Sequence, residues 1–320
     1  MASRRFGGIY PVLYAFYDRH GRIDAGAMRA QVEHCIEAGA HGITVLGLVT
    51  EVKALTTAER QELVELVGKV IGGRVAYAVT VAEQDPAGQI AFARMAAANG
   101  ADWVILQPPP GKGLSDAQLA DHFGTIADTA PLPVAIQNNP VNLDSALSPA
   151  GLVALVKAHP NIRLLKAEGW SVDIATVLEQ LGGAVDAFGG HGGLEFIALM
   201  RSGGAGLIPA PDCVAIQVSI YAALASGDPA AVAVAERLHK EVLPLIVFMT
   251  HAIPVMWCYG KRLMARRLGM AEVFDRQTSL APTPFGLAEA TRLFADVQAA
   301  ERTLLPELRT LASVRQAKSA

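Results

Sequence analysis

The sequence predicts a (β/α)8 TIM barrel with a C-terminal helical extension. Short apolar runs alternate with longer stretches of helical period, eight such runs can be counted, and the strand signal stops after the eighth. A chain of 320 residues exceeds the usual single domain, but barrels of this kind reach that length around one core. We therefore expect a catalytic barrel domain at 1–225 and a helical region at 226–320 packed on it.

The predicted strands are short and apolar, as strands buried on both faces of a parallel sheet are. Glycines such as Gly39, Gly100 and Gly183 commonly stand between a helix and the strand that follows it. The eight runs are 9–15, 43–46, 75–81, 103–106, 134–137, 162–165, 184–188 and 206–208.

The predicted helices between the strands place their apolar side chains on one face. In 57–70, apolar residues from Leu63 onward fall mostly on one side. Thr56 or Thr57, followed by Glu59, is typical of a helix start. The other predicted helices of the barrel are 25–38, 86–99, 115–127, 148–158 and 171–181.

After the eighth strand, three long amphipathic helices are predicted, at 229–250, 254–268 and 287–311. They account for the expected extension. The most apolar stretch among them, 242–250, is too short to span a bilayer, so no membrane partner is expected.

Composition and charge exclude several function classes. A hydrophobic content of 52% with 18% charged residues indicates a compact protein with a large core. A net charge of -3 gives no field that would gather nucleic acid. Cys35, Cys213 and Cys258 lack paired spacing and are interpreted as reduced core thiols. Tyr10 and Pro11 interrupt the early apolar run that a signal peptide would need, so the expected location is cytoplasmic.

Reactive groups of such a barrel lie where strands end and loops begin. Lys166 directly follows the run 162–165, so its ammonium is expected in the mouth of the barrel. Desolvation favours the neutral amine, which can attack a ketone and form a Schiff base. A lysine that extends to the surface, or one paired with Glu168, is the alternative interpretation.

Glu168 lies two residues beyond Lys166 and shares its side of the strand if the strand continues that far. A carboxylate whose pKa is raised by a dry environment can remove a proton beside an iminium and later return it. We therefore predict Glu168 as the catalytic acid and base, with a structural ion pair as the alternative.

The loop after the second strand runs from Gly47 to Glu51 and is predicted to bind the substrate. Its amides around Val49, together with the Thr50 hydroxyl, are placed to hold a carboxylate. Alternatively, Thr50 caps the turn and Glu51 is a solvated or structural charge.

The loop after the seventh strand is rich in glycine and is also predicted to meet the substrate. Gly189 and its neighbours around His191 let a ligand approach the backbone, although a structural histidine is the alternative. Metal-ligand spacings and nucleotide-binding glycine patterns are absent from the sequence, so neither a metal nor a bound cofactor is expected.

Together these residues resemble the dihydrodipicolinate synthase and N-acetylneuraminate lyase superfamily of class I aldolases and dehydratases, over nearly the whole chain. The resemblance implies a covalent Schiff base on Lys166, pyruvate-like substrates and a homo-oligomer, either tetramer or dimer. It rests on Gly47 to Glu51, residues 55–60, Pro108 and Pro109, Asn138 with Pro140, Lys166 and Gly189.

The sequence departs from the synthase pattern where most members carry a proton-relaying tyrosine, which is Gln137 here. A second tyrosine is replaced near Pro110, and the arginine that binds the aldehyde substrate aligns with Asn142. The L-2-keto-3-deoxyarabonate dehydratases are similar in having that glutamine and the Lys-x-Glu pattern. This similarity implies that Glu168 takes over proton transfer.

The predicted function is therefore dehydration of a 2-keto-3-deoxy sugar acid by a Schiff-base lyase, in which Gln137 and His191 bind substrate hydroxyls. A pyruvate-dependent aldolase or synthase is the first alternative, because the same enamine serves both reactions. A catalytically inactive barrel that binds keto acids is the second.

Overall fold

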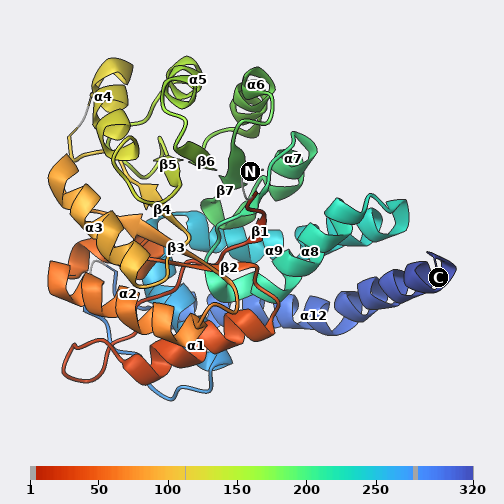
Figure 1. Cartoon of the computed structure of the whole chain (residues 1–320). Coiled ribbons are helices and arrows are strands. Elements are labelled where there is room, and N and C mark those ends of the chain that lie inside the picture. The colour runs from red at the N-terminus through yellow and green to blue at the C-terminus, as the bar shows by residue number, and fades with distance from the viewer. Residues whose placement is uncertain (1–4, 112, 277–279, 320) are drawn as a thin grey trace.

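The computed structural model describes residues 5–111, 113–276 and 280–319, with side chains as far as residue 311. Within these residues, eight parallel strands form one sheet in the order β1-β8-β7-β6-β5-β4-β3-β2 (Figure 1). The ring is closed by Thr44, which accepts from Leu13 N and donates to Pro11 O. The strands are β1 (Gly8–Ile9), β2 (Gly42–Val45), β3 (Ala76–Val81), β4 (Trp103–Leu106), β5 (Val134–Asn138), β6 (Ile162–Ala167), β7 (Asp186–Gly189) and β8 (Gly206–Leu207).

The predicted barrel is confirmed, but the first strand is shorter than expected. Only Gly8 and Ile9 form a regular ladder, with β8. Pro11 lacks an N–H and so interrupts the donors along this edge. Beyond the closing contacts, the backbone of Tyr14 bonds instead to the side-chain amide of Gln31 in the first helix.

Helices surround the sheet, as Figure 1 shows. The predicted helix start at Thr56 is confirmed, since Thr56 and Glu59 form a reciprocal capping box. The short α7 and the almost wholly apolar α8 were not predicted, because neither shows a clear polar face in the sequence. The helices of the barrel are α1 (Ala25–Glu37), α2 (Thr57–Ile71), α3 (Pro86–Ala98), α4 (Asp116–Ala127), α5 (Pro149–Ala158), α6 (Ser171–Leu181), α7 (Phe196–Arg201) and α8 (Val214–Ser226).

The C-terminal helices follow the barrel and pack on it. Helix α9 (Pro229–Thr250) lies against α8 and against α12 (Pro284–Ser319), whose C-terminal end extends beyond the body of the molecule (Figure 1). The helix predicted at 254–268 is divided into α10 (Ile253–Val255), a π-helical turn (Met256–Gly260) and α11 (Lys261–Arg267).

Among the described residues, no single helix is long and apolar enough to cross a membrane. The pair formed by α9 and Ile253–Arg267 passes that test only when taken together, with a bend of 108° between its two parts. Leu238, Val242 and Leu245 of α9 are buried within the protein, as in a core helix of a globular fold.

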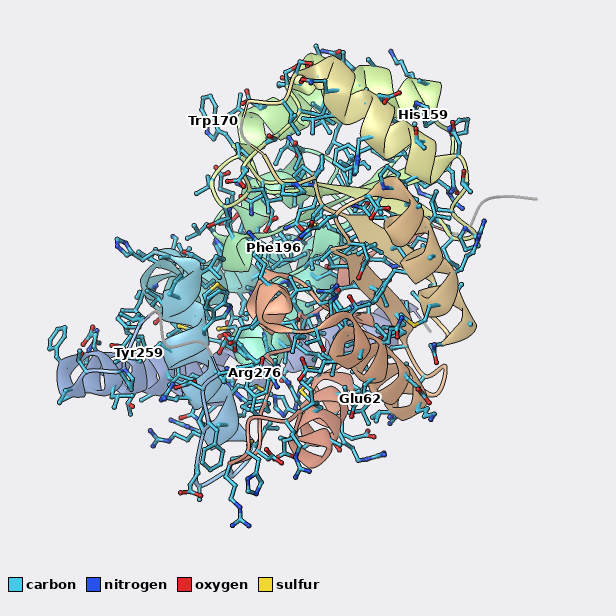
Figure 2. The ribbon with its side chains drawn as sticks, turned by 90° about the vertical axis from the view of Figure 1, so that its left-hand side faces the viewer. Glu62, His159, Trp170, Phe196, Tyr259 and Arg276 are labelled. Carbon is cyan, nitrogen blue, oxygen red and sulfur yellow. The ribbon has the colours of Figure 1, made fainter. Side chains whose placement is uncertain are left out.

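Aromatic side chains fill the barrel below its mouth. Trp103 stacks on Phe188 at 5.7 Å between ring centroids, and Tyr10 meets both rings edge-on. All three are buried, so this part of the barrel is a packed core. In contrast, Trp170 in the loop after β6 projects outward and is 62% exposed (Figure 2).

Candidate active site

Lys166 lies near the carboxyl end of β6, paired in register with Gln137 of β5 and Phe188 of β7. Lysine side chains usually lie at the surface, where water solvates the ammonium, but Lys166 is only 5% exposed. It lines a cavity together with Val49, Glu168 and His191. Three of the predicted loops therefore meet at this lysine, as expected from the carboxyl-end rule for barrels.

Glu168 lies on the same side of the sheet as Lys166, because the strand pairing continues beyond Ala167. The backbone N–H of Glu168 donates to Asn138 O at 2.9 Å. Its Oε2 lies 3.4 Å from Lys166 Nζ, and each of the two side chains is 6% exposed. The structure thus brings an amine and a carboxylate together in one buried pocket.

Amide side chains hold the Glu168 carboxylate in place. Gln137 Nε2 donates to Glu168 Oε2 at 2.6 Å, and Asn139 Nδ2 donates to the same oxygen at 2.9 Å. Gln107 Nε2 in turn donates to Gln137 Oε1 at 3.0 Å, which fixes the orientation of that amide. Hence Gln137, one of the predicted site residues, contacts the carboxylate directly.

The pKa of Glu168 is lowered, contrary to the expectation from the sequence. Burial alone would raise this pKa, but Lys166, His191 and the hydrogen bonds from Gln137 and Asn139 together outweigh it. The sequence indicated the dry environment but not the donors around it. In the free site, Glu168 is therefore an ionised carboxylate, which suits a base.

Gly190 makes room for this carboxylate. A Cβ at position 190 would lie only 2.0 Å from Glu168 Oε1. The backbone of the strand-seven loop therefore packs directly against the acid, and any side chain at 190 would displace it.

His191 faces the loop after β5 across the mouth of the cavity. Its Nε2 lies 3.2 Å from Asn142 Nδ2 and 3.4 Å from Asn139 Oδ1. The residue has a φ of 48°, a left-handed conformation that costs energy for a residue other than glycine. Its position is thus fixed by both backbone and side-chain contacts.

In the strand-two loop, Leu48 and Val49 line the cavity, whereas Thr50 and Glu51 make other contacts. Thr50 is buried, and its hydroxyl donates to Leu13 O at 2.7 Å. Glu51 is buried in an ion pair with Lys261. Of the residues predicted to bind the carboxylate, Val49 lines the cavity.

The remaining predicted residues, Gly47 and Gly189, allow close packing. A Cβ on Gly47 would approach Val12 Cγ1 to 2.8 Å, and one on Gly189 would approach Leu199 Cδ2 to 2.7 Å. Gly189 also lines a neighbouring cavity that includes Glu168 and His191. Both glycines shape the site through the backbone.

Three polar residues of the site were not predicted: Gln107, Asn139 and Asn142. The polar ends of strands four and five, Gln107 and the run Gln137 to Pro140, were visible in the sequence. However, the sequence could not indicate that Asn139 points to Glu168 while Asn138 bonds to the backbone of Leu147.

A buried lysine beside a carboxylate, in a cavity at the carboxyl end of a (β/α)8 barrel, is the arrangement that a lyase of the class I aldolase type requires. The family model described as "Dihydrodipicolinate synthetase family" matches residues 5–265, and the chain belongs to this family. Its members act on keto acids through a covalent Schiff base on a lysine, without a separate cofactor.

Relatives in sequence include two kinds of enzyme. The "4-hydroxy-tetrahydrodipicolinate synthase" of Methanoculleus marisnigri is 29% identical over 260 residues, which cover 78% of this chain and 87% of that protein. The "Probable 2-dehydro-3-deoxy-D-pentonate aldolase YjhH" of Escherichia coli K12 is 29% identical over 247 residues, which cover 76% and 81% of the two chains.

Solved structures support the fold. The 4-hydroxy-tetrahydrodipicolinate synthase of Methylacidiphilum fumariolicum SolV has a TM-score of 0.86 at 22% identity and covers 95% of this chain and 99% of its own. The sialic acid aldolase of Ruminococcus gnavus has a TM-score of 0.84 at 20% identity, with coverages of 94% and 100%.

Proposed function

We propose that this chain is a hydro-lyase that dehydrates a 2-keto-3-deoxy sugar acid of the L-2-keto-3-deoxyarabonate type. One observation carries the proposal: Glu168 lies 3.4 Å from Lys166 and is held by Gln137. The family resemblance implies a proton-relaying tyrosine at the position of Gln137. A base beside the lysine is what proton removal next to an imine requires. We therefore assign proton transfer to Glu168 rather than to a tyrosine.

The first step is imine formation. Lys166 gives a proton to Glu168, and its neutral amine attacks the C2 carbonyl carbon. Glu168 then returns this proton to the carbinolamine hydroxyl, which leaves as water. The iminium that remains is positively charged and withdraws electrons from C3. The 3.4 Å distance places the Glu168 carboxylate within reach of atoms bonded to this nitrogen.

The second step is removal of a C3 proton by Glu168. The lowered pKa of Glu168 keeps it ionised for this task. The electrons of the broken C–H bond form the neutral enamine, so the positive charge at Lys166 disappears. Lys166 lowers the pKa of Glu168 in the free site, so loss of that charge raises the pKa and lets the acid hold its new proton.

The third step expels the C4 hydroxyl. The enamine electrons move toward C4, the C4–O bond breaks, and Glu168 gives its proton to the departing hydroxide, which leaves as water. Hydrolysis of the remaining imine returns the amine of Lys166. The net reaction removes one water from the substrate and consumes no oxidant or reductant.

The substrate contacts are assigned by position around the cavity. The backbone around Val49 holds the carboxylate at C1, and His191 with Asn142 meets the hydroxyls beyond C4. Because both ends of the Gln137 amide already make hydrogen bonds, we assign it the orientation of Glu168 rather than the binding of a hydroxyl.

The test is to incubate the protein with 2-keto-3-deoxy sugar acids of five and six carbons and to follow loss of water from the substrate by mass spectrometry. We expect dehydration of at least one, and a borohydride-trapped adduct on Lys166 with pyruvate. If no keto acid gives a trapped adduct, the proposal fails.

A pyruvate-dependent aldolase or synthase is the second candidate, because the aldolase and synthase relatives share this chain's family. It predicts release or consumption of pyruvate, which lactate dehydrogenase detects directly. A barrel that binds keto acids without turnover would give the adduct but neither product.

We also propose that the chain assembles as a dimer or tetramer, as the family resemblance implies. Light scattering of the purified protein measures this, and a monomer at micromolar concentration would contradict it.

A further inference from the structure

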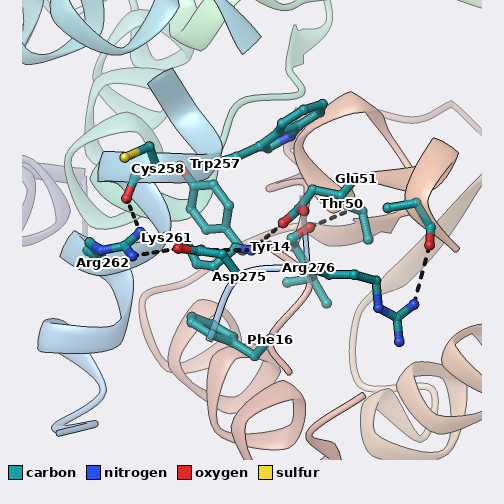
Figure 3. Close-up of polar contacts among 12 residues, drawn as sticks. Tyr14, Phe16, Thr50, Glu51, Trp257, Cys258, Lys261, Arg262, Asp275 and Arg276 are labelled. Carbon is teal, nitrogen blue, oxygen red and sulfur yellow. Dashed lines mark hydrogen bonds and ion pairs between the residues drawn. The ribbon is translucent and has the colours of Figure 1, made fainter. Parts of the chain in front are cut away.

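The C-terminal region contacts the strand-two loop (residues 47–51), which brings Val49 to the candidate site. Trp257, in the π-helical turn, donates its indole N–H to Leu48 O at 2.9 Å. Lys261, the first residue of α11, forms a buried ion pair with Glu51 (Figure 3). The two contacts therefore bracket Val49 and Thr50 along the chain.

The loop is held in a conformation that needs such support. Glu51 has a φ of 58°, in the left-handed region that a residue other than glycine adopts at a cost. Thr50 N donates to Gly47 O and Glu51 N donates to Leu48 O, so the loop is a tight turn. A strained backbone of this kind persists only where its surroundings determine it.

Lys261 is itself fixed on several sides. Its Nζ lies 3.8 Å from Asp275 Oδ1 and 5.1 Å from the centre of the Tyr17 ring. Asp275 is also paired with Arg262 at 2.5 Å. Figure 3 shows Lys261 with Arg262 and Asp275, next to Glu51. Because these contacts hold the Lys261 ammonium in place, its ion pair also restrains the position of the Glu51 carboxylate.

Stability alone is a weak reason for this arrangement. A buried ion pair loses the hydration of both charges, and apolar residues of similar volume often give equal or better stability. However, an ion pair fixes the relative position of its two side chains more strictly than an apolar contact does. Here one partner belongs to the loop that reaches the candidate site.

We propose that Lys261 and Trp257 are positioning residues that fix the strand-two loop, so that the backbone around Val49 can hold the carboxylate of a 2-keto acid beside Lys166. This inference rests on the proposed function, because it requires a keto acid bound at Lys166. The C-terminal helices would thus contribute to substrate binding indirectly. Lys261 and Trp257 would act through the strand-two loop and would not contact the substrate.

Two variants test the proposal. Trp257→Phe removes the indole N–H but keeps an aromatic ring. The double variant Glu51→Gln, Lys261→Met removes both buried charges while keeping similar volumes, which avoids leaving one charge unpaired. The matched control is Arg267→Met, Glu301→Gln, a partly buried pair at 2.9 Å that joins α11 to α12 instead of the loop.

The measurement is the concentration of ketone that gives half-maximal borohydride trapping. Two ketones are compared: pyruvate, and hydroxyacetone, which has no carboxylate. We expect half-saturating pyruvate to rise about tenfold or more in the double variant, the equivalent of roughly 1.4 kcal/mol of binding. A smaller rise, about threefold, is expected for Trp257→Phe. Trapping of hydroxyacetone should not change in either variant or in the control.

Turnover gives an independent measurement. Loss of a contact made equally in ground and transition states raises KM and leaves kcat nearly unchanged. Unchanged pyruvate trapping in both variants would overturn the proposal, as would an equal loss for both ketones. If the double variant does not fold, Trp257→Phe alone decides. A wild-type protein that forms no adduct overturns the proposed function and this inference with it.

Discussion

The chain contains two buried lysine and glutamate pairs that differ in what surrounds them. Lys166 lies 3.4 Å from Glu168, and both line a cavity. Lys261 is in closer contact with Glu51, both side chains are 1% exposed, and Tyr17 and Asp275 complete the enclosure. Burial of a lysine beside a carboxylate therefore does not by itself identify a reactive amine, and we propose Lys166 because it also lines a cavity.

The carboxylates differ as well. Amide donors from Gln137 and Asn139 help to lower the pKa of Glu168. Burial raises the pKa of Glu51, and Lys261 only partly opposes this effect. Several hydrogen-bond donors thus stabilise the ionised form of Glu168, whereas Glu51 relies mainly on the Lys261 ammonium. We expect mutations to separate the two pairs clearly.

The largest expected effect is on imine formation. Lys166→Ala should abolish the borohydride-trapped pyruvate adduct, because no other amine lies beside the cavity in the part of the chain that the structure describes. Lys261→Met should retain the adduct. Intact-protein mass spectrometry measures both. An adduct in Lys166→Ala would show that the reactive amine is elsewhere.

The next largest effect is on turnover. Glu168→Gln keeps the shape of the side chain but removes the base, so dehydration should fall by about 10²- to 10⁴-fold. Imine trapping should persist, because Lys166 is intact. Glu51→Gln is the comparison on the other pair and should lower turnover far less than Glu168→Gln in whatever protein remains folded. Near-normal turnover in Glu168→Gln would remove it from the mechanism.

A third difference concerns stability. Lys261→Met leaves Glu51 buried without its cation and should lower the free energy of unfolding by about 3–5 kcal/mol. Lys166→Met should cost much less, because the amides of Gln137 and Asn139 still serve Glu168. Urea unfolding at neutral pH compares the two variants. A similar loss in both would contradict the distinction drawn between the pairs.

The stability of Lys261→Met should also depend on pH. The pKa of Glu51 is raised in the folded protein even with Lys261 present, and removing that cation raises it further. The folded variant then binds a proton that the unfolded chain has lost. Its stability is therefore greatest below the ordinary glutamate pKa and falls as pH rises through the raised value.

The smallest expected effect is on the pH profile. Asn139→Leu removes one donor that helps to lower the pKa of Glu168, so that pKa should rise. Since the base must be ionised, the acidic limb of kcat/KM moves to higher pH. The change is measured against the wild-type profile, and an unmoved limb would indicate that Asn139 does not tune the base.

The sequence was sufficient for the barrel and for the proximity of Lys166 and Glu168. Lys166 and Glu168 could be found because the strand rule fixes both their depth and their side. The hydrogen-bond donors around Glu168 could not be identified from the sequence. Asn138 and Asn139 are adjacent residues of the same type, and only the backbone conformation decides which one faces inward. Lys261 could not be linked to Glu51, since the two are 210 positions apart.

The strand-two loop shows a second limit. The sequence suggested Thr50 and Glu51 as ligands of an anion, because both are polar at a strand end. In the fold, Thr50 satisfies Leu13 O and Glu51 satisfies Lys261, while the apolar Val49 reaches the cavity. Residue type was therefore a poor guide in this loop, because the polar side chains bond within the fold and an apolar residue lines the cavity.

The aromatic plug of Tyr10, Trp103 and Phe188 has a kinetic consequence for imine chemistry at Lys166. Since these rings fill the barrel beneath the lysine, we expect ligands to enter and leave at the rim, where His191 lines the cavity. The water released when the imine forms and the water that hydrolyses it would then pass through the same opening as the substrate. Product release would therefore depend on water entering the cavity, and a bulky side chain at the rim would slow both imine hydrolysis and product release.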